Sequence, residues 1–198
     1  MKNMSVYDCK IISISGNARC GKDTMGNNFS SALSEIGIKT KTVSFANELK
    51  KSVNSFLLEQ TGISAFTEDD EEKKIIRPFL VCWGTDVIRK IDNNTWINKL
   101  EKNLCDKSVN IITDLRFLNE LNWVKSNNGF SIMLEREGIE PANDYEKSNN
   151  HQISKEVDLN FSVGNFEDSE LLMLTSVQIL DKLINKETYD LWKATCPL

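Results

Sequence analysis

One glycine-rich stretch carries the residue types that bind phosphate. It reads Gly16-Asn17-Ala18-Arg19-Cys20-Gly21-Lys22-Asp23-Thr24, between a short β-branched run and a segment that predicts a helix. The spacing Gly-x4-Gly-Lys in that context is the pattern of a phosphate-binding loop. Gly16 permits the tight turn out of the strand, and Gly21 lets the backbone approach a phosphate. The N–H groups of the loop and the first helical turn then point at the anion, and Lys22 supplies a mobile charge for the outer phosphates.

Two positions of this loop leave alternatives open. Asp23 and then Thr24 stand where Ser or Thr usually follows the lysine, so the usual hydroxyl ligand of Mg²⁺ is displaced by one residue or replaced by a carboxylate. Cys20 lies near a helix N-terminus, where the pKa of a thiol can be lowered, or it is a small loop filler. An ordinary glycine-containing turn is the alternative to a phosphate site.

A second cluster of candidate residues lies in segment 77–96. It combines two arginines and two tryptophans with a threonine and an aspartate: Arg77, Trp83, Thr85, Asp86, Arg89 and Trp96. Arginines fork onto phosphate oxygens, and an aromatic plane can stack on a base. Asp and Thr can hydrogen-bond base edges or sugar hydroxyls. The alternative is an amphipathic helix with surface arginines and core tryptophans.

Further charged residues follow two later strands. Asp114 ends a predicted strand, in the place of a carboxylate that meets the metal of a phosphate-binding loop, and Arg116 is placed to reach a transferring phosphoryl group. A helix cap and a surface arginine are the alternative. Arg136 begins a long polar stretch, and His151 lies near its end. A lid there would exclude water. We assign His151 no general-base role, because a phosphate acceptor is already anionic near neutral pH.

Alternating strands and helices must position these residues. The predicted strands are 10–15, 39–45, 109–113, 130–135 and 159–163. The predicted helices are 25–36, 46–58, 67–88 with Pro78 in a first turn or at a kink, 95–104, 119–126 and 167–185. The polar stretch 135–155 predicts a long loop or lid. This order predicts a three-layer α/β/α fold, with a mainly parallel five-stranded sheet covered by helices on both faces. Right-handed crossovers then bring the strand C-termini, and the candidate residues, to one edge.

Composition limits the protein class. A chain of 198 residues suits a single domain, 1–198, with residues 1–9 as an N-terminal lead. The net charge of −5 argues against a general nucleic-acid binder. No apolar run approaches the roughly 20 residues that span a bilayer, and the N-terminus has no apolar signal core. The five cysteines contain no Cys-x2-Cys pair, which favours a reducing cytoplasm over a disulfide framework or zinc site. We therefore expect a cytoplasmic protein without membrane or nucleic-acid partners.

Three blocks, in this order, resemble the phage and bacterial deoxynucleoside monophosphate (dNMP) kinases. They are Gly16-x4-Gly21-Lys22-Asp23-Thr24, then Arg77-x6-Gly84-Thr85-Asp86-x2-Arg89-x6-Trp96, then Asp114-Leu115-Arg116-Phe117-x-Asn119-Glu120. His151-x2-Ser154 and Val163-x-Asn165 also resemble that family, and the similarity runs from about residue 10 to 183. Trp83 stands where the family tends to have a smaller residue, and the family's His-x-Ser-Glu pattern has altered spacing here.

The resemblance implies a P-loop kinase fold with parts at 10–36 (P-loop unit), 46–106 (helical acceptor region), 135–156 (lid) and 159–198 (last strand and C-terminal helices). It implies transfer of the ATP γ-phosphoryl group to a dNMP, with Mg²⁺ held mostly by nucleotide phosphates and water near Asp23 and Asp114. By this resemblance, Lys22, Arg116, Arg136 and Asp114 would be catalytic. ATP would bind residues 16–24 and Asn165. The dNMP would bind Arg77, Trp83, Gly84, Thr85, Asp86, Arg89, Trp96 and His151.

Two other functions stay open. Phosphomevalonate-type kinases share a Gly-Lys-Asp loop, so a kinase of another small phosphorylated acceptor fits the same loop. A nucleotide-binding regulatory module without turnover would also need the loop, although it has less use for arginines around a γ-phosphate. We further expect a homodimer, with apolar helix faces near Leu80 or Leu183 as places for the contact.

Overall fold

The computed structural model describes residues 10–164. The predicted N-terminal lead (1–9), Asn165 and the helix expected over 167–185 lie outside the described residues.

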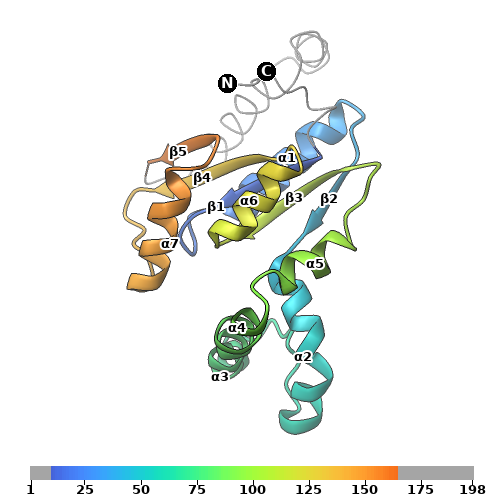
Figure 1. Ribbon diagram of the computed structural model, residues 1–198, viewed down its shortest axis with the longest axis vertical. Helices are drawn as coiled ribbons and strands as arrows, with labels where there is room; N and C mark the ends of the chain where they lie inside the picture. Colours follow the sequence, from blue (N-terminus) through green and yellow to red (C-terminus); the bar gives the residue numbers. More distant parts are fainter. Residues whose placement is uncertain (1–9, 165–198) are drawn as a thin grey trace. The chain divides into compact units, whose positions relative to one another are not determined.

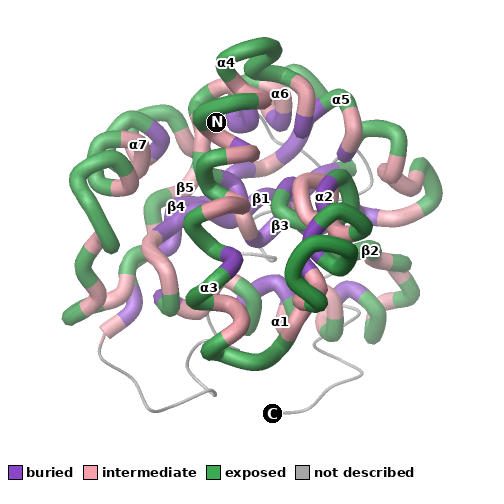
Figure 2. The backbone as a smooth tube through the Cα atoms, turned by 90° about the horizontal axis from the view of Figure 1, so that it is seen from below, coloured by how far each residue is buried: buried purple, intermediate pink, exposed green. Residues whose placement is uncertain are grey.

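A five-stranded sheet organises the fold (Figure 1). Its strands are β1 (Ile11–Ser15), β2 (Thr40–Val43), β3 (Val109–Leu115), β4 (Phe130–Arg136) and β5 (Leu159–Val163), in the spatial order β2-β3-β1-β4-β5. β1 pairs in parallel with β3 and β4, and β4 pairs in parallel with β5. Every residue of β1 is buried, as expected for a central parallel strand covered on both faces (Figure 2). The predicted α/β sheet is confirmed.

Helices cover both faces of this sheet. α1 (Lys22–Glu35) buries Met25, Phe29 and Leu33 in one core with Ile12 and Ile14 of β1. α6 (Leu118–Ser126) connects β3 to β4 and crosses over β1 in the opposite direction along the sheet (Figure 1). Because such crossovers are right-handed, α1 and α6 lie on opposite faces.

The segment after β4 forms a helix where the sequence predicts a long loop. α7 (Asp144–Ser154) is capped by Asn143, whose side chain accepts a hydrogen bond from the N–H of Glu146 at 2.8 Å. Ile153 is its one buried residue, so the helix has no apolar stripe for periodicity to detect. The capping asparagine was the available signal.

The described chain divides into two compact units. The sheet, α1, α6 and α7 belong to the first unit, which is built from 10–42 and 104–164. The second unit, 43–103, is helical: α2 (Phe45–Thr61), α3 (Asp70–Val81), the π-helix η1 (Cys82–Ile88), α4 (Arg89–Ile91) and α5 (Thr95–Glu101). Its core includes Val53, Leu57, Ala65 and Ile76. Within 10–164, no helix is long and apolar enough to cross a membrane.

Candidate active site

The loop between β1 and α1 has the backbone that the glycine spacing predicts. Gly16 has φ 142° and Gly21 has φ 102°, both in the left-handed region that favours glycine. A Cβ on Gly16 would lie 2.1 Å from the carbonyl oxygen of Leu134 in β4, so the loop passes directly against the neighbouring strand. Among the described residues, no side chain caps the N-terminus of α1, which begins after Gly21. The first N–H groups of α1 are therefore oriented for an anion.

Lys22 is held inside this loop. Its Nζ donates to the carbonyl oxygens of Gly16, at 2.9 Å, and Asn17, at 2.6 Å. The ammonium thus lies among the backbone groups of the glycine loop, in the place where a lysine can reach the outer phosphates of a nucleotide.

Cys20 is a packing residue of the loop. It is 1% exposed, and burial raises the pKa of its thiol more than the neighbouring Lys22 ammonium lowers it. The thiol is therefore protonated near neutral pH, and the lowered pKa considered from the sequence is not found. The remaining loop positions are half-buried (Asn17, Ala18) or exposed (Arg19, Thr24).

Asp23 contacts β3. Its Oδ1 accepts a hydrogen bond from Thr113 Oγ1 at 2.6 Å. One turn further along α1, a Cβ on Gly26 would lie 2.6 Å from the methyl carbon of Thr113. The carboxylate that replaces the usual hydroxyl residue therefore ties the start of α1 to the strand that carries Asp114. Its role toward a metal stays a prediction.

A β-bulge lies where β3 delivers Asp114. Ser13 pairs with Ile112, whereas Ser15 pairs with Leu115, so β3 has one residue more than β1 across this interval. The extra residue falls at Thr113 and Asp114. Bulges of this kind often lie beside active sites, where they change the direction of a side chain.

Glu120 fixes the backbone after β3. Its Oε2 accepts the N–H of Arg116 at 2.8 Å and the N–H of Phe117 at 3.1 Å, and the residue is 1% exposed. The carboxylate satisfies donors at the start of α6, as an acidic residue at the third helical position does. Arg116 itself is exposed, on a backbone held by this buried carboxylate. The sequence analysis included Glu120 in a motif but gave it no role. Its position three residues after Phe117 was the signal that it caps the start of α6.

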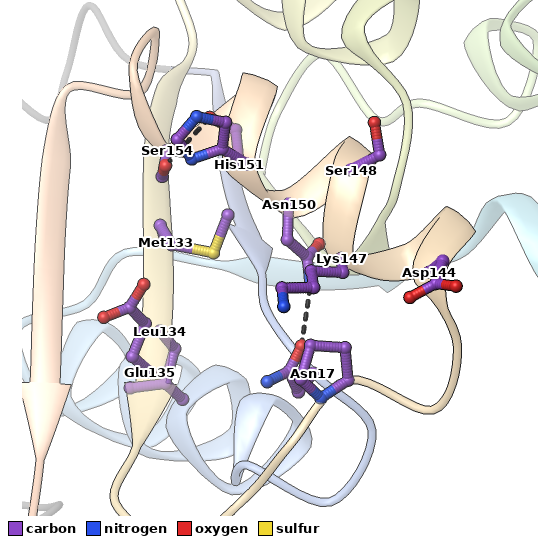
Figure 3. Close-up of a pocket in the computed structure, with 11 residues that line it drawn as sticks. Asn17, Met133, Leu134, Glu135, Asp144, Lys147, Ser148, Asn150, His151 and Ser154 are labelled. Carbon is purple, nitrogen blue, oxygen red and sulfur yellow. Dashed lines mark hydrogen bonds between the residues drawn. The ribbon is translucent and has the colours of Figure 1, made fainter.

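A cavity of about 520 Å³ lies beside the P-loop (Figure 3). Asn17 of the loop, the end of β4 and α7 line it, with polar groups that include Glu135, Lys147, Ser148, Asn150 and His151. Asn17 Nδ2 donates to the carbonyl of Ile139 at 3.0 Å, and Asn150 Nδ2 donates to Asn17 Oδ1 at 2.7 Å. The structure therefore brings His151 and the predicted lid together with the P-loop. Sequence reasoning missed Lys147 and Asn150, which lie in the helix that it did not predict.

Arg136, the last residue of β4, does not line this cavity. It is half-buried, and its carbonyl accepts the N–H of Ile139 at 3.1 Å, which turns the chain toward α7.

In the second unit, both tryptophans of the predicted acceptor segment are packed. Trp96 is 2% exposed, and its indole N–H donates to the carbonyl of Gly84 at 3.1 Å. Trp83 stacks on Phe79, with ring centroids 6.4 Å apart and an angle of 13° between the planes. These positions match the core tryptophans that were the alternative interpretation, and a base-stacking role stays a prediction.

The segment Cys82–Ile88, which holds Gly84, Thr85 and Asp86, is a π-helix of seven residues. π-Helical turns are rare and frequently lie at functional sites. Thr85 is half-buried, and Asp86 is exposed, with a carboxylate oxygen 3.9 Å from the ammonium of Lys90.

Two arginines of the predicted acceptor segment flank the π-helix. Arg77 lies in α3, and Arg89 directly follows η1. Arg77 is exposed, and Arg89 donates to the carbonyl of Asn93 at 3.3 Å.

Within residues 10–164, no group of three or more His, Cys, Asp and Glu side chains forms a ready-made metal site. The oxygens of Asp23 and Asp114 are the donor type that Mg²⁺ prefers, and Mg²⁺ commonly takes one or two carboxylates together with substrate phosphates.

Comparison with known proteins gives one family. Residues 14–130, more than half of the chain, match the family model described as phosphomevalonate kinase. No curated protein matches the chain. Among solved structures, an unliganded sugar kinase from Janibacter sp. HTCC2649 aligns with 87% of this chain and 95% of its own, at 13% identity and a TM-score of 0.37.

Proposed function

The chain belongs to the phosphomevalonate kinase family. We propose that it is an ATP-dependent kinase, and that its acceptor is the phosphate of a deoxynucleoside monophosphate. The observation that carries the proposal is the glycine loop with Lys22 inside it, at the uncapped start of α1. A triphosphate binds such a loop through backbone N–H groups, and the ammonium of Lys22 exchanges carbonyl oxygens for phosphate oxygens.

In the transfer step, an oxygen of the acceptor phosphate attacks the γ-phosphorus, and the bond to the β–γ bridging oxygen breaks to release ADP. Lys22, Arg116 and Arg136 stabilise the charge on the moving group. The hydrogen bonds that Glu120 accepts from the backbone N–H groups of Arg116 and Phe117 limit the positions that Arg116 can take. Asp114, with Asp23, would hold Mg²⁺ or its water shell, and the ion would supply further charge stabilisation. No strong base is needed, because the acceptor oxygen is already anionic.

The acceptor proposal rests on the block Arg77 to Trp96. We assign the acceptor phosphate to the guanidinium groups of Arg77, in α3, and Arg89, after η1. Because Trp83 and Trp96 are packed, we assign recognition of the base or sugar to the side chains of Thr85 and Asp86. A carboxylate such as that of Asp86 accepts hydrogen bonds from amino and hydroxyl groups.

Phosphomevalonate is the second candidate acceptor, and the family match favours it. It has a phosphate for the two arginines and needs no platform for a base. Asp86 distinguishes the two candidates. Its carboxylate can accept hydrogen bonds from the amino or hydroxyl groups of a nucleoside, but it would repel the carboxylate of a mevalonate derivative.

The test is ADP formation with ATP and Mg²⁺ against the four common dNMPs, the matching ribonucleotides and phosphomevalonate. We expect turnover with one or more dNMPs, a higher KM for that acceptor in Asp86→Ala, and no change in Glu101→Ala, an exposed acid of the same unit. Turnover with phosphomevalonate alone would replace the first candidate by the second. Tight ATP binding without turnover on any acceptor would refute the proposed transfer and favour a regulatory module.

A further inference from the structure

One side chain of the P-loop joins it to the segment 137–154, which we call the lid segment. Asn17 Nδ2 donates to the carbonyl of Ile139, before α7, and Asn17 Oδ1 accepts from Asn150 in the second turn of α7 (Figure 3). A single amide thus contacts the lid segment at two points eleven residues apart in sequence.

The chemistry of the partners fixes the direction of both amides. A backbone carbonyl can only accept, so the NH₂ group of Asn17 must face Ile139. The oxygen of Asn17 then faces α7, and Asn150 must donate its own NH₂ group. Neither asparagine can be replaced by aspartate without placing two acceptors against each other.

The same residue touches the phosphate-binding lysine. The backbone carbonyl of Asn17 accepts from Lys22 Nζ at 2.6 Å. If the ammonium of Lys22 moves to phosphate oxygens, the backbone carbonyl of Asn17 loses this hydrogen bond. The side chain of the same Asn17 contacts the lid segment.

We propose that Asn17 is a positioning residue that couples the phosphate-binding loop to the lid segment. Its side-chain bonds to Ile139, before α7, and to Asn150, in α7, hold the lid segment beside the cavity, so that occupancy of the loop and the position of the lid segment depend on each other. The catalytic consequence rests on the proposed kinase function, because a lid held over the loop excludes water from the γ-phosphate. The coupling itself does not rest on that function.

Limited proteolysis tests the coupling without any turnover. Trypsin can cut at the exposed Lys147 only when α7 opens locally. We expect the cleavage rate to rise roughly threefold to tenfold in Asn17→Ala, and less in Asn150→Ala, which loses one of the two bonds. The double variant should match Asn17→Ala, because the second change removes a bond already lost. Asn149→Ala, the neighbouring half-buried asparagine of the same helix, is the matched control and should cut at the rate of the unchanged protein.

The second part of the proteolysis experiment adds Mg-ATP. We expect it to slow cleavage at Lys147 in the unchanged protein and to protect Asn17→Ala much less. If dNMP turnover is found, Asn17→Ala should also raise ATP hydrolysis without acceptor, relative to transfer, by several-fold. Equal cleavage rates of Asn17→Ala and the unchanged protein would overturn the coupling. It would also be overturned if Asn149→Ala were cut as fast as Asn150→Ala, or if the effects of the two single changes on the cleavage rate added fully in the double variant. Coupling found without kinase turnover would support this inference while refuting the proposed function.

Discussion

Replacing Gly16 by alanine tests the closest backbone approach at the site. The new Cβ would lie 2.1 Å from the carbonyl oxygen of Leu134, and real Cβ contacts essentially never fall below 3.0 Å, so at least 0.9 Å must be relieved. Leu134 cannot easily give way, because β4 is paired on one side with β1 and on the other with β5. The displacement must therefore occur in the glycine loop.

The energetic cost has two parts. Overpacking in a rigid environment costs about 1–3 kcal/mol, and a positive φ at a non-glycine residue adds about 1–2 kcal/mol. We expect Gly16→Ala to lower the free energy of unfolding by about 2–5 kcal/mol. Gly37→Ala is the matched control: it also has a positive φ (78°), but a Cβ added there would have no atom within 4 Å. It should cost about 1 kcal/mol, since part of the strain is offset by the reduced entropy of the unfolded chain.

Urea denaturation measures both costs, and titration with ATP measures the functional effect. Displacement of the loop by nearly 1 Å should weaken ATP binding at least tenfold in Gly16→Ala and leave Gly37→Ala unaffected. The reasoning would be refuted if the free energies of unfolding of Gly16→Ala and Gly37→Ala differed by less than about 1 kcal/mol and Gly16→Ala bound ATP normally. The contact of Gly16 with β4 would then not constrain the loop.

Three further outcomes are expected. Lys22→Ala should reduce ADP formation about 100-fold or more with little change in the urea midpoint, because the lysine acts on transferring charge; a near-normal rate would contradict its role. Trp96→Phe should lower the free energy of unfolding by about 1–3 kcal/mol, measured by urea, since it removes the buried indole bond to η1; an unchanged value would contradict the packing role. Iodoacetamide at pH 8 should label Cys105 before Cys20, as measured by peptide mass spectrometry. The hydroxyl of Ser108 lowers the pKa of the Cys105 thiol, so its thiolate forms at lower pH, whereas burial raises the pKa of the Cys20 thiol. The reverse order would contradict this.

The sequence predicts most of the fold because its signals are local. β5 is predicted at its observed bounds, since apolar and polar residues alternate in Leu159–Val163. β1 is predicted within one residue, since it is a short run rich in isoleucine. α7 escapes prediction because a helix with one buried residue leaves no periodicity. Pro78 lies inside α3, where a first turn or a kink was predicted. The π-helix that follows was not predicted; a Cβ on its Gly84 would lie 2.1 Å from Cδ1 of Leu49, a close approach that no sequence pattern reveals.

The candidate site likewise has one part that the sequence predicts and another that it does not. The glycine loop follows from residue types alone, because Gly16, Gly21 and Lys22 have functions fixed by backbone geometry and charge. The contacts of Asn17 with the lid segment and of Glu120 with the backbone of Arg116 join parts that sequence periodicity cannot relate. The tryptophans show the limit of composition: an indole ring suits a base or a core equally well, and only the packing of Trp96 distinguishes them.

The contact between α1 and β3 has a consequence for evolution. Asp23 needs the hydroxyl of Thr113, and the methyl group of the same threonine leaves room for nothing larger than glycine at position 26. A mutation of Asp23 to the usual serine would shorten the side chain and leave that hydroxyl without its acceptor, so a single step toward the common motif is unfavourable. Among relatives, the residues at 23, 26 and 113 should therefore change together, and covariation at these three positions should separate lineages that keep the aspartate from those that carry a hydroxyl after the lysine.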